Sequence, residues 1–126
     1  MAIRIKRIYE PAEQGDGYRV LVDRLWPRGV SKAGAAIDLW LRDVAPSSAL
    51  RVWFGHDPAR WTEFRARYHA ELRKNSKALA PLVERAKKSA LTLLYSAHDE
   101  RFNQAVALKA YLDKQPRPTL EKTKKK

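Results

Sequence analysis

The chain has 126 residues, contains no cysteine and carries a formal net charge of +12 at pH 7. The missing cysteine excludes disulfides, a thiolate nucleophile and a cysteine-ligated metal, and it fits a reducing, cytoplasmic location. No apolar run reaches the ~20 residues of a membrane span, and the N-terminus lacks the pattern of a signal peptide. We therefore expect no membrane partner.

The length predicts one folded unit, which we place at residues 1–116, followed by a basic, disordered tail at residues 117–126. The positive charge favours anionic partners such as nucleic acid, nucleotides or phosphorylated metabolites. The alternative is that the charge serves only general solubility.

Three segments have the composition of β-strands. Residues 3–8 alternate apolar and basic side chains, which is typical of a strand with one buried face. Residues 18–25 and 90–95 are nearly continuous apolar runs, which favour strands covered on both faces. The stretch at residues 10–17, rich in Gly and acidic residues, is a loop between the first two strands.

After the second strand comes a stretch in which apolar residues recur with the spacing of a helix. Ile37, Trp40, Leu41 and Val44 fall at i, i+3, i+4 and i+7, which predicts an amphipathic helix in the stretch at residues 31–44.

Two capped helices come next. Ser47 or Ser48 can cap a short helix that runs to Trp53. Asp57, with Pro58 after it, starts the most periodic helix of the chain, which we expect to end near residue 75.

Two more helices are predicted at residues 76–88, where Pro81 should kink the helix or delay its start, and at residues 103–114. The order of elements favours a small single-domain, three-layer α/β fold. Its sheet is short, mainly parallel and flanked by helices, in a Rossmann-like or flavodoxin-like arrangement. Carboxyl ends of parallel strands meet at one edge, where α/β sheets bind ligands. If the strand at residues 18–25 is parallel to the last one, we expect the loops at residues 23–29 and 96–103 to lie together there; whether they form one pocket is left open.

The first candidate site is the charged end of the second strand. Asp23, Arg24 and Arg28 crowd this turn, which Pro27 stiffens and Gly29 allows to bend sharply. Guanidinium groups bind phosphates and carboxylates through paired hydrogen bonds. The alternative is an ion pair that only holds the loop.

The second candidate is the loop after the last strand. Ser96, Asp99 and Asn103 supply a hydroxyl, a carboxylate and an amide where a helix begins, and free N–H groups at a helix N-terminus favour an anion. The equal alternative is that Ser96 and Asp99 only cap the turn and the helix.

A third candidate is His56, beside Asp57, which would act as a general base. A locally hydrogen-bonded turn residue is the more common role of such a histidine. The spacing of His56, His69 and His98 matches no local metal motif, and we expect neither a metal nor a cofactor.

The helix beginning at residue 58 carries a fourth candidate surface. Its basic face, with the aromatic residues Trp61 and Tyr68, offers an alternative function as a nucleic-acid-binding module, helped by the lysine-rich tail. Both aromatics lie on the apolar stripe, however, so a core role for them and a solvated role for the arginines are favoured.

Five motifs together resemble the YeaO-like branch of the bacterial domain-of-unknown-function family 488. They are residues 22–29 (VDRLWPRG), 45–47 (APS), 53–58 (WFGHDP), 93–97 (LLYSA) and 103–105 (NQA). The resemblance covers about residues 3–112 and implies a small cytosolic α/β protein without an established activity. Another branch of that family has a cysteine after its final strand, where this chain has Ser96, so any thiol or metal chemistry of that branch does not carry over.

These observations favour a pocket for a phosphate-containing or other anionic ligand at the strand ends. Arg24, Arg28, Ser96 and Asn103 would bind the ligand. If the chain is an enzyme, a question the sequence leaves open, we expect hydrolysis or transfer on a nucleotide-like substrate with Asp23 or Asp99 as the base. Besides the nucleic-acid module, a small non-enzymatic adaptor is the other alternative, and the oligomeric state is left open.

Overall fold

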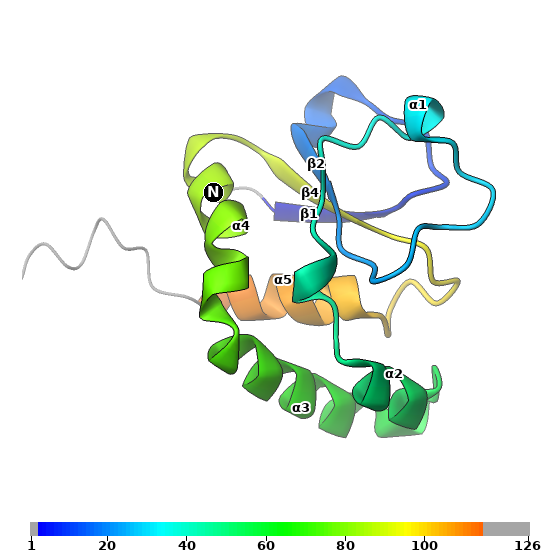
Figure 1. Cartoon of the computed structure of the whole chain (residues 1–126), viewed down its shortest axis with the longest axis vertical. Helices are drawn as coiled ribbons and strands as arrows, with labels where there is room; N and C mark the ends of the chain where they lie inside the picture. Colours follow the sequence, from blue (N-terminus) through cyan, green and yellow to red (C-terminus); the bar gives the residue numbers. More distant parts are fainter. Residues whose placement is uncertain (1–2, 115–126) are drawn as a thin grey trace, which may run out of the picture.

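The computed structural model describes residues 3–114 and shows a fully parallel four-stranded sheet (Figure 1). Its order is β1-β4-β2-β3. The strands are β1 (Ile3–Arg7), β2 (Tyr18–Leu21), β3 (Leu39–Trp40) and β4 (Leu91–Tyr95). The predicted α/β fold with a parallel sheet is confirmed. The basic tail predicted for residues 117–126 lies outside the described residues.

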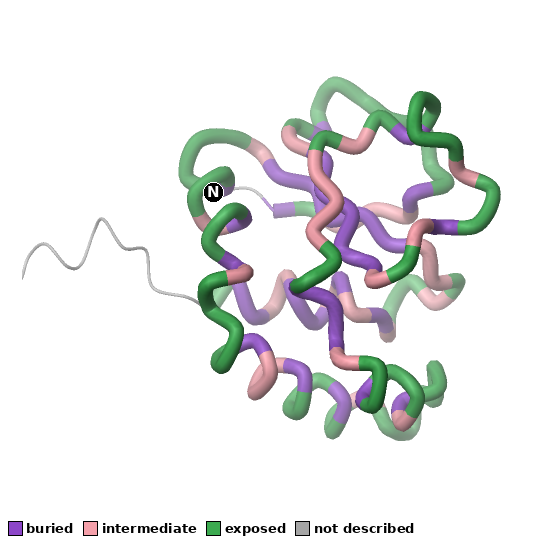
Figure 2. Tube along the Cα trace, viewed as in Figure 1, coloured by how far each residue is buried: buried purple, intermediate pink, exposed green. Residues whose placement is uncertain are grey.

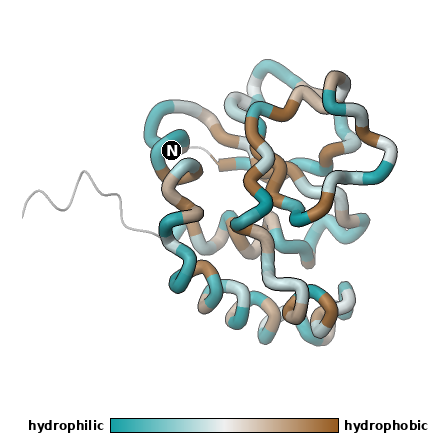
Figure 3. The backbone as a smooth tube through the Cα atoms, viewed as in Figure 1, coloured by the Kyte–Doolittle hydropathy of each residue, from teal (hydrophilic) through white to brown (hydrophobic). Residues whose placement is uncertain are grey.

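The two central strands owe their place to their apolar sequences. Every residue of β4 is buried, and Val20, Leu21 and Val22 are 0% exposed. In Figure 2 the central strands are mostly buried, and Figure 3 shows apolar residues in them as well as along the helices. The expectation that these two strands are covered on both faces is confirmed.

Helices cover the two faces of the sheet unequally (Figure 1). One face packs against the large core that four helices cover; they are α2 (Ser48–Phe54), α3 (Trp61–Lys74), α4 (Ser76–Lys88) and α5 (Gln104–Lys114). The other face has a smaller core, in which the short helix α1 (Lys32–Ala35) and its flanking loops bury Ile8, Leu21 and Leu94. Short 3₁₀ helices at Gln14–Asp16, Arg42–Val44 and Pro58–Arg60 complete the connections.

The predicted helix starts agree with the observed caps. The Ser47 hydroxyl accepts a hydrogen bond from the Leu50 amide at 3.2 Å, and the Asp57 carboxylate accepts one from the Ala59 amide at 3.0 Å. Pro81 lies inside α4 and does not delay its start, because α4 begins at Ser76, with only Asn75 between it and the end of α3 at Lys74.

The prediction of an amphipathic helix in the stretch at residues 31–44 is wrong. This segment contains the short α1, the edge strand β3 and a 3₁₀ helix instead. The four apolar residues of the predicted stripe divide between the two faces of the sheet: Ile37 and Trp40 pack in the smaller core, whereas Leu41 and Val44 pack in the larger one. Alternation explains why the neighbouring residues Trp40 and Leu41 lie on opposite faces, whereas Ile37 and Val44 lie outside the two-residue strand β3.

A buried ion pair stabilises the smaller face. The Asp16 carboxylate accepts hydrogen bonds from the Arg19 guanidinium, from Lys6 Nζ at 3.1 Å and from the Glu13 amide at 3.0 Å. Arg19 also donates to the carbonyls of residues 35 and 36, which fixes the end of α1. Burial raises the pKa of Asp16, but these hydrogen bonds outweigh it, so the pKa lies below its usual value.

Candidate functional site

A cavity of about 400 Å³ lies at the carboxyl ends of β2 and β4. The loops at residues 23–28 and 96–104 both line it, so the two segments expected to meet do meet. A third segment, at residues 45–56, closes it from the side of α2, with Phe64 of α3. Buried lining residues are Asp23, Pro27, Ala45, Pro46, Phe54, Phe64 and Asn103, and exposed ones are Leu25, Arg28, Arg51, Val52 and His56.

Asp23 joins the two loops. Its carboxylate accepts hydrogen bonds from the Ser96 hydroxyl at 2.6 Å, from the Ser96 amide at 3.1 Å and from the Gln104 side-chain amide. Its backbone carbonyl accepts the indole N–H of Trp40 at 2.8 Å. The side chain is 7% exposed. Asp23 therefore holds β2, the loop after β4 and the start of α5 in one arrangement.

The electrostatic state of Asp23 differs from that of an ordinary paired carboxylate. Burial raises its pKa, and this effect outweighs the opposing hydrogen bonds from Ser96 and Gln104 and the positive charge of Arg51. All three donors are neutral groups. The carboxylate is thus desolvated without a hydrogen-bonded cation to compensate its charge.

Arg24 lines the cavity and also joins two of the segments that form it. Its Nε donates to the Pro46 carbonyl at 3.3 Å, and its Nη2 donates to the carbonyls of Ala45 and Pro46 at 3.3 and 3.2 Å. The ion pair with Asp23, which was the structural alternative, is not formed. Arg24 instead holds the turn before α2 against the end of β2.

Arg28, in the turn after β2, and Arg51, in α2, both line the cavity. Both are exposed, and the described residues offer neither guanidinium a hydrogen-bond or ion-pair partner. The turn that carries Arg28 is ordered by the indole of Trp26, which donates to the Val30 carbonyl at 2.6 Å, and by Gly29, whose φ of 78° confirms the expected sharp bend. Two donor-rich cations therefore face the cavity with their hydrogen bonds unused.

The predicted loop residues differ in what their side chains do. Asn103 donates to the Asp99 carbonyl at 2.8 Å and accepts from the Val106 amide at 3.0 Å, so it caps α5. Asp99 does not line the cavity; its carboxylate accepts the amides of Arg101 and Phe102, which hold its pKa below the usual value. The capping alternative, which named Ser96 and Asp99, describes Asp99, whereas the Ser96 hydroxyl donates to Asp23.

His56 lies on the exposed side of the cavity in an uncommon backbone conformation. Its φ is 56°, directly after Gly55 at 54°, and left-handed residues other than glycine often mark functional sites. The ring lies 6.0 Å from that of Phe54, centroid to centroid. No described side chain orients the imidazole through a hydrogen bond, so the geometry does not prepare it as a general base.

Among the charged and amide side chains of the lining, two were missed as candidates. Gln104 directly follows the capping residue Asn103, and this position on a helix that starts at the sheet edge is a signal that sequence reasoning could have used. Arg51 has no such signal, because it lies in a short helix whose position over the strand ends is known only from the fold. Within residues 3–114 no cluster of three or more His, Asp or Glu side chains is placed to hold a metal ion.

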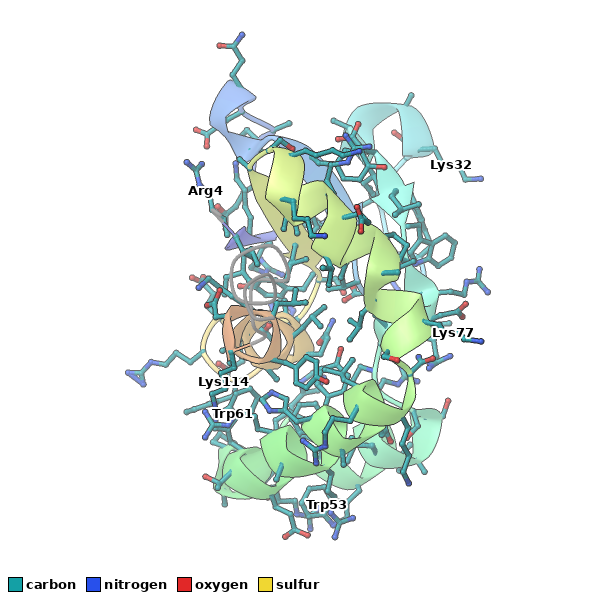
Figure 4. All side chains as sticks on the ribbon, turned by 90° about the vertical axis from the view of Figure 1, so that its left-hand side faces the viewer. Arg4, Lys32, Trp53, Trp61, Lys77 and Lys114 are labelled. Atoms are coloured by element: carbon teal, nitrogen blue, oxygen red, sulfur yellow. The ribbon has the colours of Figure 1, made fainter. Side chains whose placement is uncertain are left out.

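The aromatic residues predicted beside the basic face of α3 lie in or against the core. Phe64 and Tyr68 are buried, and Trp61 packs against Phe102 with ring centroids 5.3 Å apart, between α3 and α5 (Figure 4). Arg67 pairs with Glu63 along the helix. The core role expected for these aromatics is confirmed. No helix in the described part of the chain has the length and apolar character to cross a membrane.

Comparison with known proteins identifies relatives over nearly the whole chain. Residues 2–125 match the family described as the inactive DUF488-N3 subclade. The uncharacterized protein YeaO of Escherichia coli (strain K12) is 46% identical over 112 residues, which cover 89% of this chain and 97% of YeaO. The uncharacterized proteins Mb3100c of Mycobacterium bovis and Rv3073c of Mycobacterium tuberculosis are each 43% identical over 105 residues, covering 82% of this chain and 88% of each relative.

No solved structure matches the chain. The family match and the YeaO relationship agree with the resemblance that the five motifs indicated. The chain belongs to the inactive DUF488-N3 subclade of the DUF488 family, in its YeaO-like branch.

Proposed function

We propose that this protein binds a small anionic ligand, with phosphate-containing compounds as the first class to test, in the cavity at the carboxyl ends of β2 and β4. The observation that carries the proposal is the pair of guanidinium groups, Arg28 and Arg51, that face this cavity without partners in the described structure. A guanidinium donates up to five hydrogen bonds in a geometry that matches phosphate and carboxylate oxygens.

The charge of the lining supports an anion over a cation. Arg24, Arg28 and Arg51 bring three positive charges, and Asp23 is the one carboxylate among the lining residues. That carboxylate already accepts three hydrogen bonds from Ser96 and Gln104, so it repels an incoming anion less than a free carboxylate would.

Binding without turnover is the form of the proposal that the observations favour. The family is described as inactive, Asp99 lies outside the cavity lining, and His56 is not oriented for proton transfer. The raised pKa of Asp23, caused by burial, is the one feature that favours a hydrolase or transferase with Asp23 as general base. Release of inorganic phosphate from nucleotides or sugar phosphates, abolished in Asp23→Asn, would establish that alternative.

A thermal-shift screen of phosphate-bearing compounds, followed by calorimetry on the compounds that raise the melting temperature, tests the proposal. Arg28→Ala and Arg51→Ala should each weaken binding by about tenfold or more, because a hydrogen bond to a charged group contributes about 1.5–3 kcal/mol. Both side chains are exposed and unpaired, so the melting temperature of the free protein should change little.

Arg65→Ala is the matched control. Arg65 is an exposed arginine on α3 outside the cavity lining, so this variant removes the same charge from the protein without touching the site. Equal weakening in all three variants would indicate nonspecific attraction by the net charge, and the proposed site would then be rejected.

A further inference from the structure

We infer that the ligand is an amphipathic anion, with its charged group attached to an aromatic or aliphatic body that carries few hydroxyl groups. This inference rests on the proposed function and narrows it to one chemical class. It excludes inorganic phosphate and hydroxyl-rich sugar phosphates as the preferred ligands.

The buried part of the cavity is mainly apolar. Pro27, Ala45, Pro46, Phe54 and Phe64 supply apolar surface there. Phe54 and Phe64 are stacked with ring centroids 4.2 Å apart, so aromatic surface borders the cavity. A flat apolar group of a ligand gains both burial and aromatic contact from such walls.

The polar side chains at the strand ends, buried Asn103 and half-buried Ser96 and Gln104, already form hydrogen bonds within the protein. Both polar atoms of Asn103 are hydrogen-bonded in the cap of α5. The Ser96 hydroxyl and the Gln104 amide nitrogen donate to Asp23. A ligand with several hydroxyl groups would therefore lose hydrogen bonds to water and find few replacements, which lowers its affinity.

The exposed side of the cavity combines cations with apolar side chains. Leu25 is 67% exposed and Val52 is 78% exposed, and both line the cavity together with Arg28 and Arg51. In residues 3–114 the only other large apolar side chain of comparable exposure is Tyr9. Exposed apolar residues that gather beside partner-free guanidiniums match a ligand that has both an anionic and an apolar part.

The size of the cavity agrees with this class. Its volume of about 400 Å³ lies within the range of roughly 300–1,000 Å³ typical of small-molecule sites. A single phosphate ion would leave most of this apolar-walled space to water, whereas an anion with a ring or a short alkyl group would fill it.

Isothermal titration calorimetry of the full chain with phenyl phosphate, glycerol phosphate and inorganic phosphate tests the inference. Phenyl phosphate should bind about tenfold more tightly than glycerol phosphate, because burying about two carbon groups changes affinity by this factor. Val52→Ser and Leu25→Ser should weaken phenyl phosphate severalfold and leave inorganic phosphate unchanged. Ala66→Ser, an exposed substitution on α3, should alter neither.

The outcomes separate the inference from the proposed function. Equal affinity for phenyl and glycerol phosphate, with both lost in Arg51→Ala, would overturn the inference and leave the anion site standing. Binding of none of the three anions would overturn both. Phenyl phosphate binding that is preferred but insensitive to Val52→Ser and Leu25→Ser would place the apolar recognition elsewhere and overturn the inference as argued.

Discussion

The loop that enters β2 and the loop that leaves it each bury one carboxylate, and the protein holds the two in opposite ways. Asp16, 1% exposed, forms hydrogen-bonded ion pairs with Lys6 and Arg19. Asp23, 7% exposed, accepts only neutral donors, from Ser96 and Gln104. The same residue type, at the same depth and on either side of one strand, therefore meets two different electrostatic environments.

This difference distinguishes the structural ion pair of Asp16 from the proposed binding site beside Asp23. Burial raises the pKa of both carboxyls, but at Asp16 the hydrogen bonds from the Glu13 amide, Lys6 and Arg19 more than offset it, whereas at Asp23 burial dominates. The cations near Asp16, Lys6 and Arg19, form ion pairs with its carboxylate. Those near Asp23 include Arg51, which faces the cavity and keeps its hydrogen-bonding capacity for a ligand.

The largest expected effect is that of Asp16→Asn. This substitution keeps the size of the side chain but leaves the buried Arg19 without its counter-charge, and breaking a buried pair in this way costs about 3 kcal/mol of unfolding free energy. Urea denaturation at pH 7 measures it. Asp113→Asn, which removes an exposed pair with Lys109 on α5, is the control and should cost less than about 1 kcal/mol.

The pH dependence of the Asp16→Asn effect follows from the lowered pKa. The carboxylate contributes its stabilisation fully above the unfolded value of 3.8, and the contribution disappears as the pH falls through the lower folded value. The difference in unfolding free energy between wild type and Asp16→Asn should be constant from pH 7 to 5 and shrink below pH 4. A difference that grows on acidification would contradict the pairing described for Asp16.

The same substitution at the other carboxylate, Asp23→Asn, should cost only about 1 kcal/mol at pH 7. The amide loses charge-assisted hydrogen bonds, but it also relieves the burial of a charge that no hydrogen-bonded cation compensates. Urea denaturation in parallel with Asp16→Asn provides the comparison. Equal costs at the two positions would show that the identity of the donors, charged or neutral, does not distinguish these carboxylates.

The pH signature of Asp23→Asn has the opposite sign. Because the folded pKa of Asp23 lies above 3.8, the folded state binds more protons than the unfolded state in the interval between the two values, so the carboxyl contributes more stability below this interval than above it. The cost of Asp23→Asn should therefore be larger at pH 4 than at pH 7. A cost that falls on acidification would mean that the pKa of Asp23 is not raised.

The meeting of the loops beside Asp23 could be predicted because it follows from strand polarity. The apolar runs at residues 18–25 and 90–95 indicate buried parallel strands, and the carboxyl ends of such strands share one edge. The hydrogen bonds between Asp23 and Ser96 confirm that the first and second candidate segments lie together. That they bind a ligand stays a prediction.

Three features could not be predicted from local sequence patterns. The edge strand β3 has two residues, too few to display alternation, and the spacing of Ile37, Trp40, Leu41 and Val44 matches a helix by coincidence. The position of Arg51 depends on how the chain returns from β3 across the strand ends, which no periodicity encodes. The ion pairs of Asp16 likewise join β1, β2 and the loop between them through tertiary structure alone.

The smallest expected effect on stability is that of Arg51→Gln, which tests the electrostatic coupling between Arg51 and Asp23. Arg51→Gln should change the unfolding free energy by less than about 0.5 kcal/mol, since an exposed, unpaired side chain contributes little, yet it should raise the pKa of Asp23 further, because the charge of Arg51 now lowers it. Carboxyl-carbon NMR titration of Asp23 measures this shift, and Arg65→Gln should leave the pKa of Asp23 unchanged.

An unaltered pKa in Arg51→Gln would mean that the cation facing the cavity and the buried carboxylate are electrostatically independent, and an anionic ligand held by Arg51 would then leave Asp23 unaffected as well. A raised pKa would instead mean that such a ligand, by neutralising Arg51, shifts Asp23 in the same direction, so that the titration of this one carboxyl also reports occupancy of the site.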